Sequence, residues 1–204
     1  MKKIILIGGG GHCNSCIDVI EQQGIYEILG IIDKASELGK KVLGYKVVGT
    51  DDDLSRFRDE CDFALVTVGQ IRSPELRSQI YKLLKELAFY IPVVLSPLAY
   101  VSKHAVLGQG TIVMHDALVN AGVTIGKNCI INSQVLVEHN ATIGNHCHIA
   151  TGAILNGGVS VGDGSFIGSG ATLKQGISLG SRVVVGMGEL LKRDLLDNVT
   201  YSRK

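Results

Sequence analysis

The sequence predicts a Rossmann-like α/β unit over residues 1–94, followed by a left-handed parallel β-helix of six-residue repeats over residues 95–204. Two observations support this fold class. Charged residues are unevenly distributed: residues 1–94 hold 25 of the 39, whereas residues 95–188 hold only seven. An aliphatic residue also recurs at every sixth position from Leu95 to Val185. We therefore place the boundary between the two domains near residue 94.

The composition of the whole chain excludes several classes of protein. With 204 residues and a formal net charge of +1, the chain lacks the basic excess of a protein that binds nucleic acid regardless of its sequence. No apolar run approaches the roughly 20 residues of a membrane span, and the first apolar stretch is too short for a signal peptide. Five cysteines without a regular spacing suit a reducing compartment. We expect a cytoplasmic protein that does not insert into membranes.

The first domain begins with the pattern of a β-α-β unit. Residues 3–7 form a short apolar strand, residues 8–11 are four glycines, and residues 13–23 read as a helix before a strand at residues 28–33. A glycine loop that enters a helix can hold a phosphate on its backbone amides. The spacing is not a clean G-x-G-x-x-G, so it does not predict NAD. Cys13-x-x-Cys16 matches a redox motif, but an incidental pair one helical turn apart is favoured.

The remaining elements of the first domain alternate in the same way. A strand is expected at residues 62–68, a helix from Pro74 to Leu87, and a last strand at residues 89–95. The three aspartates at residues 51–53 are interpreted as a helix cap. Alternation of strands and helices predicts a small parallel sheet that binds ligands at the carboxyl ends of its strands.

The repeat in the second domain is continuous over sixteen hexads. Neither a helix nor a flat strand has a period of six, whereas a coil of three short sides, eighteen residues in all, does. Sixteen hexads give about five coils. All sixteen repeat positions are aliphatic: Leu95, Val101, Leu107, Val113, Val119, Ile125, Ile131, Val137, Ile143, Ile149, Leu155, Val161, Ile167, Leu173, Leu179 and Val185.

This repeat resembles the hexapeptide acyltransferase superfamily, which implies homotrimers with acetyl-CoA in the groove between neighbouring β-helices. A purely structural β-helix and a trimeric carbonic anhydrase are the alternatives. His115, His146 and His148 occupy different hexad positions, so they do not form the triad that a zinc site needs. Cys129 and Cys147 share an interior position and are interpreted as buried, inert thiols.

The most informative side chain that points out of the coils is His139. It is third in its hexad, at a corner, where an imidazole could accept the proton of an attacking nucleophile near neutral pH. Glu138 or Asn140 could orient the ring. A solvated corner histidine is the alternative interpretation.

The segment from Glu138 to Ala153 resembles the bacterial sialic acid O-acetyltransferase and nucleotide-aminosugar N-acetyltransferase family, whose motif is E-H-(D/E)-x-x-I-G-x-x-x-H-(I/V)-x-x-G-A. The resemblance implies that His139 is the general base and that acetyl-CoA contacts His148. Asn140 stands where much of the family has an acid. Further cofactor contacts are implied at Gly157, Ser169 and Met187.

The resemblance extends to the first domain. Gly10, Gly11 and His12 match a G-x-x-G-H loop that surrounds the sugar nucleotide, and Glu75-Leu76-Arg77 is similar to the family's E-I-R helix start. Three further positions complete the implied substrate site. Asp33 matches the first acidic residue of an aspartate pair that meets the nucleoside, Lys34 stands in place of the second, and Gly69 matches the glycine that closes the later strand.

The family resemblance implies an acetyl-CoA-dependent N-acetyltransferase acting on a nucleotide-linked amino sugar, of the UDP-4-amino-4,6-dideoxy type, for bacterial surface glycans or glycoproteins. It implies a homotrimer with active sites between subunits, and no metal is expected. O-acetylation of a sialic-type sugar and a non-catalytic sugar-nucleotide scaffold are the alternatives. The sequence alone names neither the sugar nor the base.

Overall fold

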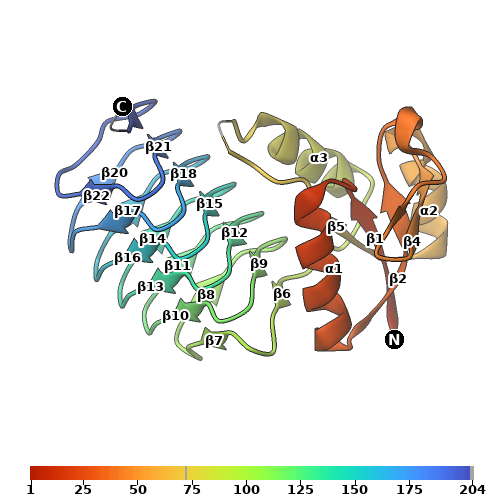
Figure 1. The fold of residues 1–204 in the computed structure, drawn as a ribbon. Coiled ribbons are helices and arrows are strands. Elements are labelled where there is room, and N and C mark those ends of the chain that lie inside the picture. Colours follow the sequence, from red (N-terminus) through yellow and green to blue (C-terminus); the bar gives the residue numbers. More distant parts are fainter. Residues whose placement is uncertain (72, 203–204) are drawn as a thin grey trace.

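A computed structural model describes residues 1–71 and 73–202. Figure 1 shows an α/β unit that lies against the side of a coiled stack of short strands. The α/β unit contains the N-terminus, and the stack runs away from it towards the C-terminus. Within the described residues, none of the helices combines the length and apolar character needed to cross a membrane.

The α/β unit has a five-stranded sheet in the order β3-β4-β2-β1-β5, parallel except for the β3–β4 pair. Ile4 to Ile7 are fully covered on both faces of β1, as a parallel sheet requires. The strands are β1 (Lys2–Ile7), β2 (Tyr26–Ile32), β3 (Lys41–Val42), β4 (Tyr45–Gly49) and β5 (Phe63–Val66). The helices are α1 (Gly11–Gln23), α2 (Leu54–Glu60) and α3 (Glu75–Glu86), with 3-10 turns at Ala35–Glu37 and Asp51–Asp53.

Two elements differ from the sequence prediction. The expected strand at residues 89–95 is wrong over most of its length: Tyr90 makes a single bridge to Phe63, and regular pairing begins only in β6 (Val94–Leu95). Pro92 lies between them and has no amide to donate to a ladder. The β3–β4 hairpin was not predicted; its turn places Leu43 and Gly44 at positive φ.

The β-helix has three parallel sheets, and each coil up to β20 contributes one two-residue strand to each sheet. We call the side against the α/β unit the docked face: β6, β9 (Ile112–Val113), β12 (Ile130–Ile131), β15 (His148–Ile149), β18 (Phe166–Ile167), β21 (Val184–Val185) and β23 (Thr200–Tyr201). The apolar face comprises β7 (Tyr100–Val101), β10 (Leu118–Val119), β13 (Leu136–Val137), β16 (Ile154–Leu155), β19 (Thr172–Leu173) and β22 (Leu190–Leu191). The hydroxyl face comprises β8 (Val106–Leu107), β11 (Thr124–Ile125), β14 (Thr142–Ile143), β17 (Ser160–Val161) and β20 (Ser178–Leu179).

The second residue of each strand points into the coil, so the predicted aliphatic column forms its core, from Val113 through Val185. At the corner between the hydroxyl and docked faces, the position directly after the strand is too tight for a side chain. A Cβ on Gly126 would lie 2.6 Å from the carbonyl carbon of Gly144 one coil further on. This explains why glycine follows the aliphatic residue at these corners.

The α/β unit is joined to the coils by a shared apolar core. Ile17 and Ile20 of α1 belong to one buried cluster with Ile112, Met114 and Ile130 of the docked face. The seam therefore holds α1, and the glycine loop that precedes it, at a set height along the β-helix.

Buried Arg77 of α3 forms the polar part of the seam. Its guanidinium donates to the carbonyl of Val66 at the end of β5 and to that of Val68. It also donates to Asn128 of the β-helix, to the backbone oxygen at 3.1 Å and to Oδ1 at 2.9 Å. Asn128 Nδ2 returns a hydrogen bond to the Arg77 carbonyl at 3.1 Å. Burial lowers the pKa of Arg77 to about 10, so the group remains cationic at neutral pH.

Replacing Arg77 by Met should destabilise the protein by about 2–4 kcal/mol, because several buried carbonyl oxygens lose their donor. Urea unfolding followed by circular dichroism measures the change. Lys82→Met is the matched control, since Lys82 lies on the same helix with its side chain 79% exposed. Equal stabilities of the two variants would contradict the structural role of Arg77.

Candidate active site

Two clefts open beside the glycine loop. The sheet cleft, about 550 Å³, lies at the carboxyl ends of β1, β2, β4 and β5, and includes Asp33, Lys34, Thr50, Asp51 and Asp52 above an apolar floor. The junction cleft, about 560 Å³, lies between the α/β unit and the β-helix. Its lining is His12, Ser15, Gly69, Gln70, Ile71, Asn132, Ser133, His148 and Thr151.

In the sheet cleft, the carboxylate of Asp33 holds the glycine loop in place. It accepts hydrogen bonds from the amides of Gly9 at 2.6 Å and Lys34 at 2.7 Å. The aspartates predicted to cap a helix have different roles. Asp53 forms a capping box with Thr50, while Asp51 lines the cleft. Partial burial and the neighbouring carboxylates raise the pKa of Asp51. The cleft thus offers both carboxylates and an ammonium group to a polar ligand.

The start of α1 faces the junction cleft. Gly10 is the N-cap and no side chain caps the helix, while Gly10 and Gly11 have open space where a Cβ would lie. Free amides at the positive end of a helix dipole suit a phosphate. His12, one residue further on, has a buried Nε2 without a hydrogen-bond partner among the described residues.

His148 connects the two domains across the junction cleft. Its Nδ1 lies 2.5 Å from the carbonyl oxygen of Gln70, which can only accept, so the proton is on Nδ1. Asn132 Nδ2 then donates to Nε2 at 3.3 Å. Burial is the main cause that lowers the pKa of His148 to about 4, and that of His12 to about 3 with a further contribution from Arg77. Both rings are neutral at pH 7.

His139 lies elsewhere, at the corner between the apolar and hydroxyl faces, and its side chain is exposed. The ring rests on Gly157 one coil further on, where a Cβ would come within 2.7 Å of Nε2. Asn140 Nδ2 is 3.3 Å from Nδ1 of the ring, whereas Glu138 Oε2 accepts from the His139 amide at 3.1 Å and from Asn120 at 2.9 Å. Asn140 therefore contacts the imidazole, and Glu138 holds the backbone of the turn.

The predicted site residues fall into three groups. Asp33 and Lys34 line the sheet cleft; His12, Gly69 and His148 line the junction cleft, with Gly10 and Gly11 beside it. Glu138, His139, Asn140 and Gly157 meet at a different corner of the β-helix, so one chain does not bring His139 and His148 together. Ser169 and Met187 are exposed at the corner between the docked and apolar faces, further along the coils than His148.

Several lining residues were missed from the sequence. Ser133 and Thr151 occupy the same corner column as Ser169 and Met187, each eighteen residues from the next. Counting back from Ser169 in steps of eighteen residues would have identified Thr151 and Ser133 from the sequence. Gln70 carried no such signal, since it reaches the cleft from a loop of the other domain.

The thiols do not form a redox or metal centre. Cys13, Cys16, Cys129 and Cys147 are free and buried, and burial raises the pKa of Cys13 to about 11, so it is not a reactive thiolate. Across residues 1–71 and 73–202, no group of three or more His, Cys, Asp or Glu side chains could hold a metal ion.

The depressed pKa values predict a loss of stability in mild acid. The unfolded chain protonates both histidines below about pH 6.5, whereas folded His12 and His148 stay neutral to about pH 3 and 4. The free energy of unfolding should therefore fall by about 1 kcal/mol per histidine between pH 6.5 and 5.5. Urea titrations of the wild type and His148→Asn measure this, and the variant should show a smaller loss. An identical loss in the variant would contradict the assignment to His148.

Comparisons with known proteins cover both parts of the chain. The profile of the PglD N-terminal domain matches residues 3–84, and that of the bacterial transferase hexapeptide repeat matches residues 104–139 and 140–175. No curated protein matches the sequence.

Solved structures match over nearly the full length. The acetyltransferase domain of PglB from Neisseria gonorrhoeae FA1090, in complex with acetyl coenzyme A, is 34% identical, with a TM-score of 0.91, over 98% of this chain and 95% of that one. PerB from Caulobacter crescentus, in complex with CoA and GDP-perosamine, is 33% identical, with a TM-score of 0.92, over 98% and 93%. WeeI from Acinetobacter baumannii AYE, 22% identical with a TM-score of 0.87 over 98% and 96%, shares the fold. On this full-length similarity, the chain belongs to the nucleotide-aminosugar N-acetyltransferase family of hexapeptide-repeat acetyltransferases.

Proposed function

We propose that the protein transfers the acetyl group of acetyl-CoA to the amino group of a nucleotide-linked amino sugar. The observation that carries this proposal is the pair of clefts on either side of the glycine loop. One opens at the carboxyl edge of the sheet, where Gly8 and Asp33 line it, and the other opens where His12 and His148 face each other across the two domains. The PglB domain binds acetyl coenzyme A and PerB binds GDP-perosamine, which supports the same pair of substrates here.

The chemistry of each cleft suits a different part of the sugar nucleotide. The sheet cleft, with Asp33 and Lys34, would receive the nucleoside, and the uncapped start of α1 beside His12 would receive the diphosphate. The sugar would then enter the junction cleft near Gly69. Residues 1–94 thus bind the sugar nucleotide, and residues 95–204 bind the cofactor.

The apolar face supports a homotrimer. Its outward residues run as one nearly continuous apolar row: Tyr100, Leu118, Leu136, Ile154, Thr172 and Leu190, with Tyr100 60% exposed. The equivalent row on the hydroxyl face is mostly Thr and Ser, and the docked face is covered in part by the α/β unit. An exposed apolar row of this length favours burial against other copies of the chain. Three copies would turn their apolar faces towards a common threefold axis.

This arrangement would complete the active site. Around a threefold axis, the corner that carries His139 in one subunit adjoins the corner that carries Ser133 and Thr151 in the next. His139 and Ser133 belong to the same coil, so they lie at similar heights. His139 would therefore face the junction cleft of the neighbouring subunit, where the sugar amine is expected.

In the reaction, the sugar amine attacks the thioester carbonyl and forms the N–C bond, and His139 accepts the proton of the amine. The C–S bond then breaks, and the thiolate of CoA leaves and takes up a proton. Backbone amides of the corner can stabilise the oxyanion. An amine needs less activation than a hydroxyl, which is consistent with Asn140, rather than an acid, beside His139. Because acetyl-CoA is an intracellular metabolite, we propose that the protein acts in the cytoplasm.

The proposed activity predicts release of CoA thiol when purified protein is given acetyl-CoA with UDP-, GDP- and dTDP-linked amino sugars. Free sialic acid in the same panel tests O-acetylation. Thiol release with an amino-sugar nucleotide supports the proposal, and release with sialic acid alone, or with none of the panel, refutes it.

With the active substrate, His139→Ala should lower kcat by roughly 10²–10⁴, because the general base is lost. The control is His104→Ala, an exposed histidine on the same corner two coils nearer the N-terminus. An unchanged kcat in His139→Ala would show that His139 is not the general base.

A further inference from the structure

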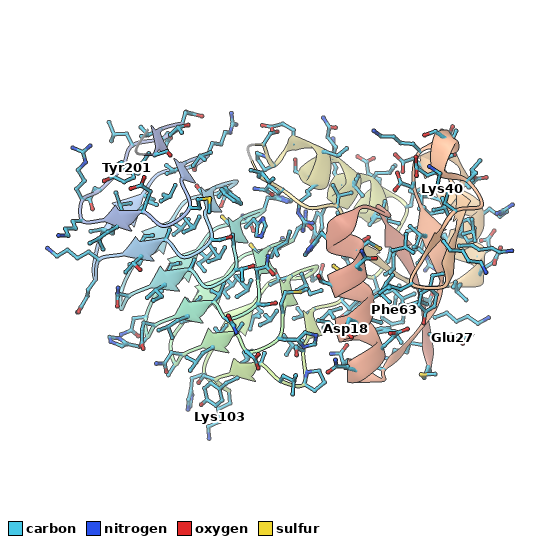
Figure 2. All side chains as sticks on the ribbon, in the orientation of Figure 1. Asp18, Glu27, Lys40, Phe63, Lys103 and Tyr201 are labelled. Carbon is cyan, nitrogen blue, oxygen red and sulfur yellow. The ribbon has the colours of Figure 1, made fainter. Side chains whose placement is uncertain are left out.

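A row of three polar side chains crosses the seam between the two domains. Oδ2 of Asp18, on α1, lies 2.7 Å from Nε2 of His115, on the β-helix. The other ring nitrogen of His115, Nδ1, lies 2.6 Å from Oγ of Ser96 in the first coil. Figure 2 shows Asp18 on the side of α1 that faces the β-helix. We call this row of Asp18, His115 and Ser96 the clasp.

The hydrogen-bonding partners of the clasp assign its protons. Oγ of Ser96 accepts from the amide of Leu98 at 3.0 Å, which leaves the hydroxyl proton for Nδ1 of His115. A neutral imidazole then carries its proton on Nε2 and donates it to the carboxylate of Asp18. Ser96 is only 3% exposed, so the row does not have the accessible nucleophile of a hydrolytic triad. Its role is to join the two domains.

The repeat places the clasp next to the junction cleft. His115 and Ser133 are eighteen residues apart in one corner column, and the amide of Gln134 donates to the His115 carbonyl at 3.0 Å. Because Ser133 lines the cleft, His115 lies one coil, about 4.8 Å, beyond that lining. On α1, Ser15 lines the cleft, and Asp18 is three residues further on, on the same side of the helix. The clasp therefore joins the two domains directly beyond the end of the cleft.

The clasp adds a directional contact to the apolar seam under α1. Apolar contacts have no preferred direction, so the seam alone leaves α1 free to roll or slide by small amounts. Hydrogen bonds weaken steeply away from their preferred angles, so the two contacts of His115 restrict that motion. Asp18 is about two helical turns from Gly11, the first residue of α1. A roll of the helix at Asp18 would therefore also turn its free amides and His12 away from the cleft.

We propose that the clasp positions the start of α1 for the binding of the sugar nucleotide. This inference rests on the proposed function, which assigns the diphosphate to the free amides of α1. The groups of the clasp act through the helix and do not touch the substrate. Loss of the clasp therefore weakens the binding of the sugar nucleotide and leaves the binding of acetyl-CoA to the β-helix unchanged.

Steady-state kinetics of His115→Ala and Asp18→Ala test the proposal. The substrates are acetyl-CoA and the UDP-, GDP- or dTDP-linked amino sugar that gives release of CoA thiol. Each variant should raise the KM for the sugar nucleotide about tenfold, the effect of losing one charge-assisted hydrogen bond. The KM for acetyl-CoA and kcat should stay within about twofold of the wild-type values. The double variant should match the single variants, since both substitutions break the same contact.

Two further variants separate positioning from a general loss of structure. His115→Gln should restore the KM for the sugar nucleotide to nearly the wild-type value, because its side-chain amide can still donate to Asp18. His104→Ala, which removes an exposed histidine of the first coil, is the matched control and should leave both KM values unchanged. Circular dichroism checks that every variant is folded.

If His115→Ala keeps the wild-type KM for the sugar nucleotide, or raises both KM values equally, the clasp does not position α1, while the proposed function stands. A His115→Gln variant that is as impaired as His115→Ala would also contradict the role of the contact with Asp18. If no amino-sugar nucleotide gives release of CoA thiol, the proposed function fails and the inference fails with it.

Discussion

The backbone hydrogen bonds between successive coils determine where the functional groups of the β-helix lie. Up to Leu191, each strand pairs with the strand one coil further on without a change of register, as in Leu136 with Ile154 and His148 with Phe166. The last coil is two residues shorter, so Val184 pairs with Thr200. Before that last coil, every corner position is therefore a straight column of residues eighteen apart. His139 and Gly157, on which its ring rests, are members of one such column, so the chemistry of the corner follows from the register.

The α/β unit adds a second constraint. It is attached at one height of the β-helix by the apolar seam under α1 and by Arg77, which bonds to Asn128. This attachment brings the helix that follows the glycine loop next to His148, and the junction cleft lies between them. The neutral state of His12 and His148 is a consequence of the same burial, reinforced by the nearby guanidinium.

Local patterns in the sequence predicted much of this structure. The six-residue period predicted the β-helix and its interior, and the glycine cluster before a helix predicted the first β-α-β unit. The corner position of His139 followed from the same register. The contact between Gln70 and His148, and the role of Arg77, could not be predicted, because they join residues more than fifty positions apart in different domains. The strand expected at residues 89–95 failed because the chain must leave one sheet to enter another.

The central claim is that each active site combines the His139 corner of one subunit with the junction cleft of the next. Co-expression of His139→Ala and His148→Ala chains in equal amounts tests it most directly. Random mixed trimers should recover about a quarter of wild-type activity, because a quarter of the interfaces pair an intact His139 with an intact His148. Activity no higher than that of the single variants would show that each site lies within one chain and would contradict the account.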